Sequence, residues 1–413
     1  MSRTLKVALT ALLVALPLVG RIAGKNGGNA VVLETDLVSN VHGLIDGNGI
    51  VHNAFTTDAN LVNPWGITAG PTTPFWIADN NAGVSTLYTV PPSGSPPVSV
   101  SSSVFTIPGP GHPLDRVGTP TGAVFNTAAT STGGFKVSGV TAGGTMTSAA
   151  ALFIFATEDG TIVGWSPTVN PQGFSTSLVG TYGIIAVDHS AIPTAAAGAV
   201  YKGLAIATDA SGSTFLYVTN FRAGTIEVYD VNFQPVTNLP AGAFVDPQLP
   251  NGYAPFNIVL IGNQLFVTYA KQDAAKHDDV ALPAHGIVDI FDLKGKMLSR
   301  FTQHAHLNSP WGVVQAPASF GDLAGAILIG NFGDGRIHAF DPDSGKELGS
   351  VTNSIGQEIV IDGLWSLTVG TGGARGGDKN TIYFTAGPNG ETAGLFGSLS
   401  PVPLGTPCGL PCR

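Results

Sequence analysis

A pair of short segments that returns along the chain constrains the fold more than any other feature. The first copy reads Asn-Pro-Trp-Gly-Ile at 63–67 and is followed by Phe-Trp-Ile-Ala-Asp-Asn at 75–80. The pair returns as Ser-Pro-Trp-Gly-Val at 309–313 and Ala-Ile-Leu-Ile-Gly-Asn-Phe at 326–332, with weaker copies between. Each pair reads as a turn residue with a short apolar strand, then a second apolar strand that ends in a polar residue. The chain is therefore built from repeats of one strand-rich unit.

Six copies of the unit can be aligned, and in several of them a third segment ends in Phe-Asp or Tyr-Asp. The third segment is clearest at 224–230, 286–292 and 335–341, where polar and apolar residues alternate as in a half-buried antiparallel strand. Successive copies begin 53 to 57 residues apart, except for one interval of 81 that contains a Gly/Thr/Ser-rich insertion at 126–149. The first strands begin near Pro64, Thr121, Lys202, Pro255, Pro310 and Gly363, and the second strands end near Asn80, Glu158, Asn220, Tyr269, Asn331 and Ala386.

A period of roughly 50 residues with about four short strands per unit is typical of a β-propeller. The alternative, a series of separate β-sandwiches, requires frequent turns but no such repeat. The last unit supplies only three strands, and the strand expected at 31–38 is the natural fourth, because pairing the chain ends removes exposed edges. We therefore predict an all-β fold, a six-bladed β-propeller over 31–401 closed by this pairing. The expected blades lie near 58–115, 120–200, 201–250, 254–305, 308–355 and 360–400 plus 31–38.

The N-terminus has the layout of a secretory signal peptide. Arg3 and Lys6 precede an apolar run from Val7 to Val19, and small residues follow up to Gly24. The run is too short to span a bilayer comfortably, and no second stretch approaches that length. We expect 1–24 to be a signal peptide rather than a buried N-terminal helix. The mature protein is then secreted, extracellular or periplasmic, without a membrane span.

Charge and cysteine usage limit the partners and the tail. Lys and Arg total 18 against 27 Asp and Glu, which gives a formal net charge of -9, and no basic run occurs. Because clustered Lys and Arg bind phosphates, nucleic acid is not an expected partner. The expected partners are a small molecule, a peptide or an envelope or matrix component, and we expect a monomer. In the tail 402–413, Cys408 and Cys412 form either a local disulfide or two free thiols.

Five segments are distinctive beyond the repeat itself, and they lie at 63–66, 153–162, 269–279, 309–312 and 394–399. Through them the chain resembles an uncharacterised family of exported bacterial six-bladed β-propellers related to the NHL-repeat group. The resemblance extends over roughly 33–401. It implies the propeller fold and export. Because that family has no assigned activity, the resemblance implies no function.

A ring of polar side chains is expected on one face. In a propeller blade the first strand lines the central channel and the second runs antiparallel beside it, so the start of one and the end of the other emerge together. Carboxylate and amide oxygens suit a small ligand, a peptide or a hard divalent cation such as calcium. The alternative is that these residues form Asx turns with their own backbone. The ligand-binding candidates are Asn63, Asp79, Asn80, Lys202, Asn220, Asn257, Tyr269, Asn308, Asn331 and Asp362.

A long charged connection at 271–285 follows the second strand of the fourth unit. By the same argument it projects over the polar face, where a long loop acts as a lid or a selectivity element. His277 could transfer protons while a neighbouring carboxylate orients it. The alternative is a solvated loop that docks by salt bridges and caps the channel. The candidate metal ligands are Asp273, Asp278, Asp279 and His285.

Two further sets of side chains have two interpretations each. His304 and His306 lie just before the fifth unit, where they could bind a transition metal, although hydrogen-bonded structure is the more common role. Trp65, Trp311 and Trp365 occupy matching positions in three units, where they could stack on a carbohydrate or aromatic ligand. We favour packing, with these indoles wedged between neighbouring blades.

The sequence thus predicts an exported binding or scaffolding propeller with a polar site for a small ligand, cation or peptide. The alternative is a metal-assisted hydrolase or lyase at the same site, with Glu158 and His277 as catalytic candidates. Neither a Gly-x-Ser-x-Gly elbow nor a His-Glu-x-x-His motif occurs. Convergence of Glu158, Asn220, Asn257 and Asn331 on an open pocket would favour the enzyme. Apolar side chains plugging that mouth would count against it.

Overall fold

The computed structural model of the chain describes residues 30–94, 97–111, 116–173, 180–303 and 306–402. The expected signal peptide at 1–24, His304 and the two tail cysteines, Cys408 and Cys412, lie outside these residues.

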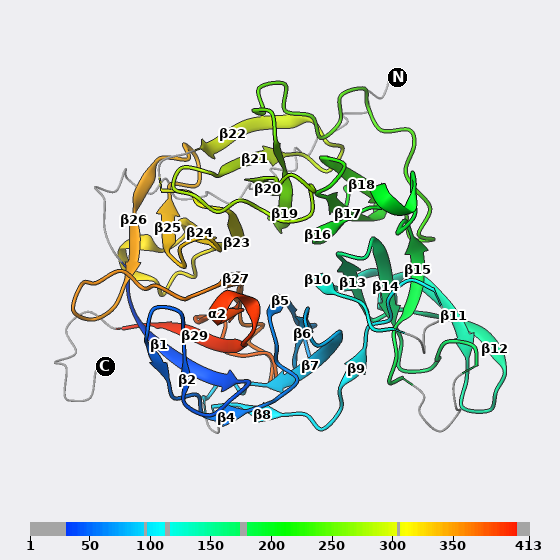
Figure 1. Cartoon of the computed structure of the whole chain (residues 1–413), viewed down its shortest axis with the longest axis horizontal. Coiled ribbons are helices and arrows are strands. Elements are labelled where there is room, and N and C mark those ends of the chain that lie inside the picture. Colours follow the sequence, from blue (N-terminus) through cyan, green and yellow to red (C-terminus); the bar gives the residue numbers. More distant parts are fainter. Residues whose placement is uncertain (1–29, 95–96, 112–115, 174–179, 304–305, 403–413) are drawn as a thin grey trace, which may run out of the picture.

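The described chain folds into small, mostly antiparallel sheets arranged radially in a propeller-like ring, as Figure 1 shows. The chain follows this ring in sequence order, so its first and last strands lie side by side. Among the described residues the two α-helices, α1 (Ala128–Ser131) and α2 (Pro388–Glu391), have four residues each. The predicted all-β class is confirmed. Within the same residues no helix is long and apolar enough to cross a membrane.

The first two sheets are each arranged as consecutive antiparallel strands. The order β5-β6-β7-β8, with β9 beside β7, comprises β5 (Pro64–Thr68), β6 (Phe75–Asp79), β7 (Val84–Thr89), β8 (Ser99–Val100) and β9 (Phe105–Thr106). The order β10-β13-β14-β15 comprises β10 (Pro120–Phe125), β13 (Phe153–Thr157), β14 (Thr161–Trp165) and β15 (Ile184–Asp188). The insertion at 126–149 contains α1 and most of a hairpin of β11 (Lys136–Val140) and β12 (Met146–Ala150).

The next two sheets repeat this arrangement. The order β16-β17-β18 comprises β16 (Tyr201–Thr208), β17 (Thr214–Asn220) and β18 (Thr225–Tyr229). The order β19-β20-β21-β22 comprises β19 (Tyr253–Ile261), β20 (Gln264–Lys271), β21 (Ile287–Phe291) and β22 (Met297–Gln303).

The remaining strands form one continuous sheet of order β23-β24-β25-β26-β1-β29-β28-β27. It comprises β23 (Pro310–Gln315), β24 (Ile327–Asn331), β25 (Ile337–Phe340), β26 (Glu347–Thr352), β27 (Leu364–Val369), β28 (Ile382–Ala386), β29 (Leu395–Pro401) and β1 (Ala30–Ser39). Beside β1 lie β4 (Thr56–Thr57), which pairs with it, and a short hairpin of β2 (Leu44–Ile45) and β3 (Val51–His52).

The two ends of the chain close the ring. β1 runs antiparallel to β29 from the pair Val32–Pro401 to the pair Ser39–Leu395. The first two residues of β1 also pair in parallel with β26, and this contact joins the last two groups of strands. The predicted pairing of the N-terminal strand with the last unit is confirmed.

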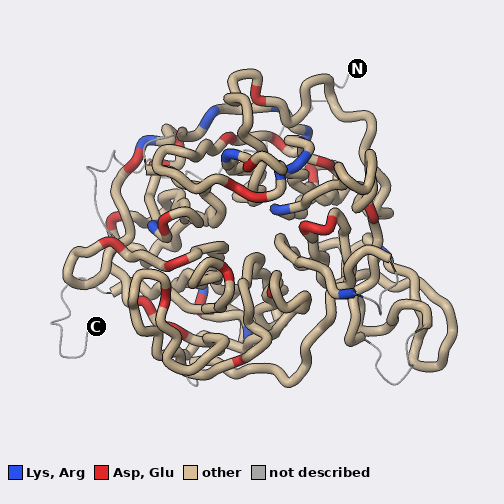
Figure 2. The backbone as a smooth tube through the Cα atoms, viewed as in Figure 1, with Lys and Arg blue, Asp and Glu red and all other residues tan. Residues whose placement is uncertain are grey.

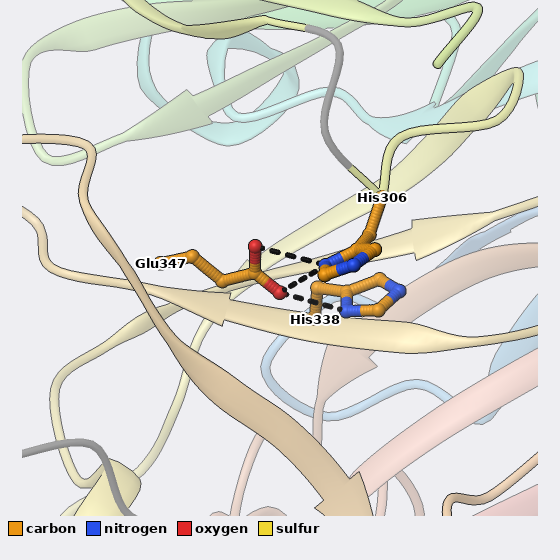
Figure 3. Close-up of side chains that lie close together, drawn as sticks. All are labelled: His306, His338 and Glu347. Carbon is orange, nitrogen blue, oxygen red and sulfur yellow. Dashed lines mark hydrogen bonds and ion pairs between the residues drawn. The ribbon is translucent and has the colours of Figure 1, made fainter. Parts of the chain in front are cut away.

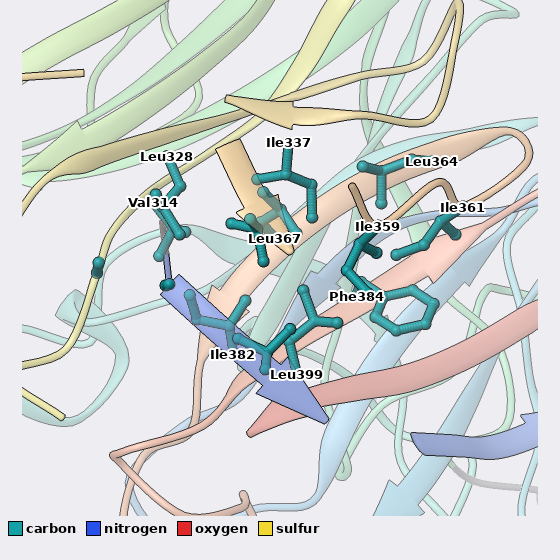
Figure 4. Packing of buried hydrophobic residues seen from close by; sticks show 14 of the residues in the cluster. Val314, Leu328, Ile337, Ile359, Ile361, Leu364, Leu367, Ile382, Phe384 and Leu399 are labelled. Atoms are coloured by element: carbon teal, nitrogen blue, oxygen red, sulfur yellow. The ribbon is translucent and has the colours of Figure 1, made fainter. Parts of the chain in front are cut away.

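A hydrophobic core fills the space between the β23–β26 and β27–β29 groups, as Figure 4 shows. Leu328, Ile361 and Phe384 are fully buried there. Burying a Leu, Ile or Phe side chain contributes about 1.5–3 kcal/mol, so this core is a main source of stability for the closing contact.

The innermost strands approach one another too closely for any side chain at one repeated position. A Cβ atom on Gly66 of β5 would lie 2.4 Å from the carbonyl oxygen of Thr121, and one on Gly122 of β10 would lie 2.6 Å from the amide nitrogen of Leu204. The repeated glycine is therefore explained by contact between inner strands. A register irregularity recurs in the pairs β5–β6, β10–β13, β16–β17, β19–β20, β23–β24 and β27–β28.

Candidate functional site

The polar face is centred on a buried lysine. Lys202, the second residue of β16, is 1% exposed, and its Nζ donates to Glu158 Oε1 and lies 3.4 Å from Asp278 Oδ1. The same ammonium group lies 4.8 Å from the centroid of the Trp65 ring, within cation–π range. Burial alone lowers the pKa of Lys202, but the charge and hydrogen bond of Glu158, together with the acids of the loop, outweigh it and raise the pKa. Lys202 is therefore a buried cation that its acidic neighbours stabilise.

A chain of side-chain hydrogen bonds extends from this lysine across the face. Asn80 Nδ2 donates to Glu158 Oε2 at 2.8 Å, and Asn63 Nδ2 donates to Glu391 Oε2 at 2.7 Å. Asn63 Nδ2 also lies 3.4 Å from Asn80 Oδ1, while Trp365 Nε1 donates to Asn63 Oδ1 at 2.9 Å. Burial raises the pKa of Glu391. The predicted residues Asn63, Asn80, Glu158 and Lys202 are thus brought together.

An aromatic cluster lies next to this polar network. The Trp65 ring stacks on Trp365 with centroids 3.6 Å apart, and Trp311 meets Trp65 edge-on at 5.0 Å. All three indoles are buried, together with Phe221 and Phe256. Packing rather than ligand stacking is therefore their role. They pack against one another from the inner strands β5, β23 and β27.

A cavity of about 320 Å³ is lined by the inner strands β5, β10, β16, β19, β23 and β27. Asn257 lines this cavity, and its Nδ2 donates to the carbonyl oxygen of Trp311 at 2.8 Å. Asn220 instead donates to Glu227 at 2.8 Å, and Asn331 donates to the carbonyl oxygen of His306 at 2.7 Å. An enzyme was expected to bring together Glu158, Asn220, Asn257 and Asn331. Each of these side chains instead has its own hydrogen-bond partner.

Four other predicted residues are buried or hydrogen-bonded within the fold. Asp79 is fully buried and accepts the Thr86 N–H at 2.9 Å, and burial raises its pKa well above the usual range. Tyr269 is buried as well. Asp362 Oδ2 accepts the N–H groups of Gly47 and Asn389 at 2.8 and 2.9 Å, and the Asn308 N–H donates to Asn331 Oδ1 at 3.1 Å. Ligand binding by these residues stays a prediction.

The loop 271–285 docks on the polar face through its middle. Asp273 Oδ1 accepts the His277 N–H at 2.8 Å and so shapes the turn. His277 Nδ1 lies 2.8 Å from Asp278 Oδ1, and this contact lowers the pKa of Asp278 to about 2 and raises that of His277. Burial raises the pKa of Asp279. His285 Nδ1 lies 3.3 Å from the Val280 carbonyl oxygen.

Ligand atoms of Glu158, His277 and Asp278 lie within 4.8 Å of one another, a spacing compatible with a metal ion. However, the Lys202 ammonium contacts both Glu158 and Asp278. It balances one of the two carboxylate charges and occupies one oxygen of each, so it competes with a metal ion for these ligands. Calcium binding here stays a prediction.

A pocket of about 620 Å³ lies beside the loop, lined by His189 to Ala197, by Asn220 to Glu227 and by Ala274 to Lys276. Its carboxylate, Glu227, accepts hydrogen bonds from the Tyr201 hydroxyl at 2.7 Å and the Tyr229 hydroxyl at 2.6 Å. His189 Nδ1 lies 3.3 Å from Glu227 Oε2. Burial, then the Glu227 charge, raises the pKa of both tyrosines, which remain donors.

Sequence reasoning missed Glu391, Glu227 and His189. Glu391 follows β28 by a few residues, so the rule that the second strand ends on the polar face could have found it. Glu227 is a polar position of the alternating segment 224–230, which predicts only a half-exposed side chain. No local pattern indicated its contact with Tyr201 or His189.

The fold and this site define an all-β protein of radially arranged sheets with a polar, loop-covered face. No protein-family profile matches the chain. It is 33% identical over 355 residues to uncharacterized protein R648 of Acanthamoeba polyphaga mimivirus, covering 84% of this chain and 77% of that protein. It is 32% identical over 353 residues to uncharacterized protein L690 of the same virus, covering 83% and 81%. The chain belongs to the family of these two proteins. The expected bacterial relatives stay a prediction.

Three solved structures are similar at low sequence identity. A streptogramin B lyase has a TM-score of 0.40 with 13% identity, covering 92% of this chain and 100% of that one. The PQQ-bound aldose sugar dehydrogenase of Streptomyces coelicolor has a TM-score of 0.44 with 11% identity, covering 90% and 99%. A glucose dehydrogenase has a TM-score of 0.45 with 9% identity, covering 82% and 96%.

Proposed function

We propose that this protein is an exported, monomeric six-bladed β-propeller that binds a small zwitterionic ligand, such as an amino acid or a short peptide. The binding site is the pocket between the 189–197 segment and the loop 271–285. The observation that carries the proposal is a pocket of about 620 Å³ with a carboxylate, Glu227, in its wall. Small-molecule sites commonly enclose roughly 300–1,000 Å³ and hold a few fixed polar groups among apolar ones.

The charges that line the pocket support this ligand class. Glu227 offers a carboxylate that two tyrosine hydroxyls and Asn220 already orient. Arg222 and Lys276 line the same pocket. A ligand with an ammonium group and a carboxylate therefore finds an opposite charge for each end. Ile192 and Pro193 provide an apolar wall for its side chain.

The loop links this pocket to the lysine at the centre of the face. Ala274 to Lys276 line the pocket, and the neighbouring Asp278 contacts Lys202. The ion pair therefore fixes the part of the loop that forms one pocket wall. We assign the central network of Lys202, Glu158 and Asn80 the role of positioning the loop.

The alternative, metal-assisted hydrolysis or elimination at the centre, receives less support. Glu158 is instead held by its ion pair with Lys202 and by the hydrogen bond from Asn80, which fix its orientation. The aromatic cluster of Trp65, Trp311 and Trp365 fills the space next to them. These contacts favour binding over catalysis.

Six blades are supported by the recurring irregularity in the inner strand pairs and by the closure between β1 and β29. Export is supported by the apolar N-terminal run behind Arg3 and Lys6. Most charged positions are scattered singly, as Figure 2 shows, and this pattern supports a small ligand over a polyanion.

Isothermal titration calorimetry with free amino acids and dipeptides tests the proposal, with neutral monosaccharides and calcium chloride as comparison ligands. We expect saturable binding of at least one zwitterion. Glu227→Gln should weaken it by about tenfold or more, because a charged hydrogen bond is replaced by a neutral one. Asp343→Asn, an exposed acid outside the pocket lining, is the matched control and should bind as wild type. Absence of zwitterion binding, or equal binding by Glu227→Gln, would overturn the proposal.

A further inference from the structure

Figure 3 shows a second cluster of chemically active side chains, His306, His338 and Glu347. His306 precedes β23, His338 is the second residue of β25, and Glu347 begins β26. His306 Nδ1 lies 2.9 Å from Glu347 Oε1, and His338 Nδ1 lies 3.2 Å from the same oxygen. The two imidazole rings stack with centroids 5.2 Å apart. Three ligand-type atoms thus point to one place.

His338 is not explained by a structural role. Its side chain is only 4% exposed, yet neither ring nitrogen has a hydrogen-bond partner in the described part of the chain. The contact with Glu347 is close but does not have hydrogen-bond geometry. Leaving a buried polar group unpaired costs about 1–3 kcal/mol, so native proteins seldom keep one without a ligand, an ion or water.

We propose that His306, His338 and Glu347 form a binding site for a divalent transition-metal ion of the zinc class. Their ligand atoms all lie within 4.8 Å of one another. A tetrahedral zinc ion with bonds of about 2.0–2.2 Å holds its donors roughly 3.4 Å apart, so small rotations of the rings suffice. Two imidazoles with one carboxylate suit zinc or its neighbours, whereas calcium prefers oxygen ligands alone.

The positions of the ligands fit such a site. His338 and Glu347 sit on paired strands, where Phe340 faces Glu347 and His338 faces Ser350 in the ladder. The backbone of His306 is held by the hydrogen bond from Asn331. The side chain of His306 is 67% exposed, so an ion can reach the site and keep a water in its fourth position.

The two other clusters of this kind are weaker candidates. In the cluster of Glu158, His277 and Asp278, the Lys202 ammonium group already contacts both carboxylates. In the cluster of Glu34, Asp36 and His52, both ring nitrogens of the histidine already face carboxylates. Only the His306 cluster, among the described residues, leaves a buried imidazole with neither ring nitrogen in a hydrogen bond.

The test is titration of chelator-treated protein with Co²⁺, followed by visible absorption, and with Zn²⁺, followed by calorimetry. We expect one site per chain with the d–d bands of a four- or five-coordinate Co²⁺ ion. His306→Ala changes an exposed residue and should preserve the fold, yet weaken binding by about tenfold or more, and Glu347→Gln should do the same. His42→Ala, a second exposed histidine, is the matched control and should bind as wild type.

Three results would overturn the inference. They are the absence of Co²⁺ bands in wild type, binding that His306→Ala leaves unchanged, and binding that is lost in His277→Ala but kept in His306→Ala. The last result would move the metal to the polar face. Circular dichroism and thermal unfolding of each variant separate loss of the site from loss of the fold.

Discussion

Lys202 is the single residue on which the polar face depends most. It lies among aromatic rings and its charge is balanced by Glu158, which is itself mostly buried. Desolvating an ammonium group is costly, so the lysine is tolerated only because the carboxylate and the loop acids surround it. If the surroundings of position 202 were purely apolar, Met or Leu would be expected there instead of Lys.

We predict that Lys202→Met destabilises the protein by about 3 kcal/mol, because it leaves the buried carboxylate of Glu158 without its counter-charge. Urea unfolding measures the change. The double variant Lys202→Met with Glu158→Gln should recover part of the loss. A single variant as stable as wild type would show that the pair contributes nothing.

Residue-level prediction from sequence succeeded where a side chain lies directly at the end of a strand. Asn63, Asn80, Glu158 and Lys202 meet as the strand-direction argument requires. Asn257 does not join this network, and ligand binding by Asn257 stays a prediction. The register irregularity between Pro255 and Asn257 lies beside this residue, which lines the central cavity instead. Such an irregularity leaves no clear mark in the sequence.

Among the elements, the closing strand β1 carries an acidic cluster with a histidine. His52 Nδ1 lies 3.1 Å from Asp36 Oδ2, and its Nε2 lies 3.5 Å from Asp46 Oδ2. Burial, then the charge of Asp36, raises the pKa of Glu34 to about 7. Burial lowers the pKa of His52, but its hydrogen bonds to Asp36 and Asp46 outweigh this and raise it.

This cluster predicts a pH dependence of stability. Glu34 and His52 both bind protons more tightly in the folded state, so their contribution is fully present below their unfolded pKa values. The contribution of Glu34 is lost as the pH rises from 4.5, the usual pKa of a Glu side chain, through about 7, the pKa of Glu34 in the folded protein. Urea unfolding across this range should show stability falling with pH. Glu34→Gln should flatten the dependence, and an unchanged slope would contradict the assignment.

The loop 271–285 is a second element for which a stabilising role and a ligand-binding role can be told apart by experiment. Asp278 is 65% exposed, and exposed ion pairs contribute about 1 kcal/mol or less. Asp278→Asn should therefore lower the unfolding free energy by less than about 1 kcal/mol. It should weaken ligand binding more clearly, because the pocket wall at Ala274 to Lys276 loses its anchor. A large loss of stability with unchanged affinity would make the loop a structural cap only.

For the whole molecule, the ring was predictable because one unit repeats. The glycines of the inner strands are the clearest link between that repeat and the architecture. Replacing Gly122 by Ala places a Cβ 2.6 Å from a backbone nitrogen of the neighbouring inner strand, which cannot give way alone. We predict destabilisation of about 1–3 kcal/mol by thermal or urea unfolding. Gly143→Ala, where the nearest atom lies 3.8 Å away, should be nearly neutral.

The closure by the N-terminal strand was also predictable, because the last unit lacked a strand. The pocket beside the loop 271–285 was not predictable, because it forms where the 189–197 segment meets this loop from a different unit. Contacts between distant connections follow from packing of the whole ring, and no local pattern encodes them. The Gly/Thr/Ser insertion likewise forms a hairpin, β11–β12, that its composition did not indicate.

Hydrogen–deuterium exchange with and without a saturating zwitterionic ligand tests the central claim most directly. If the pocket binds the ligand, amide exchange should slow in two segments together, the 189–197 connection and the loop around Ala274 to Asp279. At a ligand concentration that just saturates the wild type, Glu227→Gln should show clearly less protection in both segments. Protection confined to the central cavity or to another face, or equal protection in Glu227→Gln, would contradict the account.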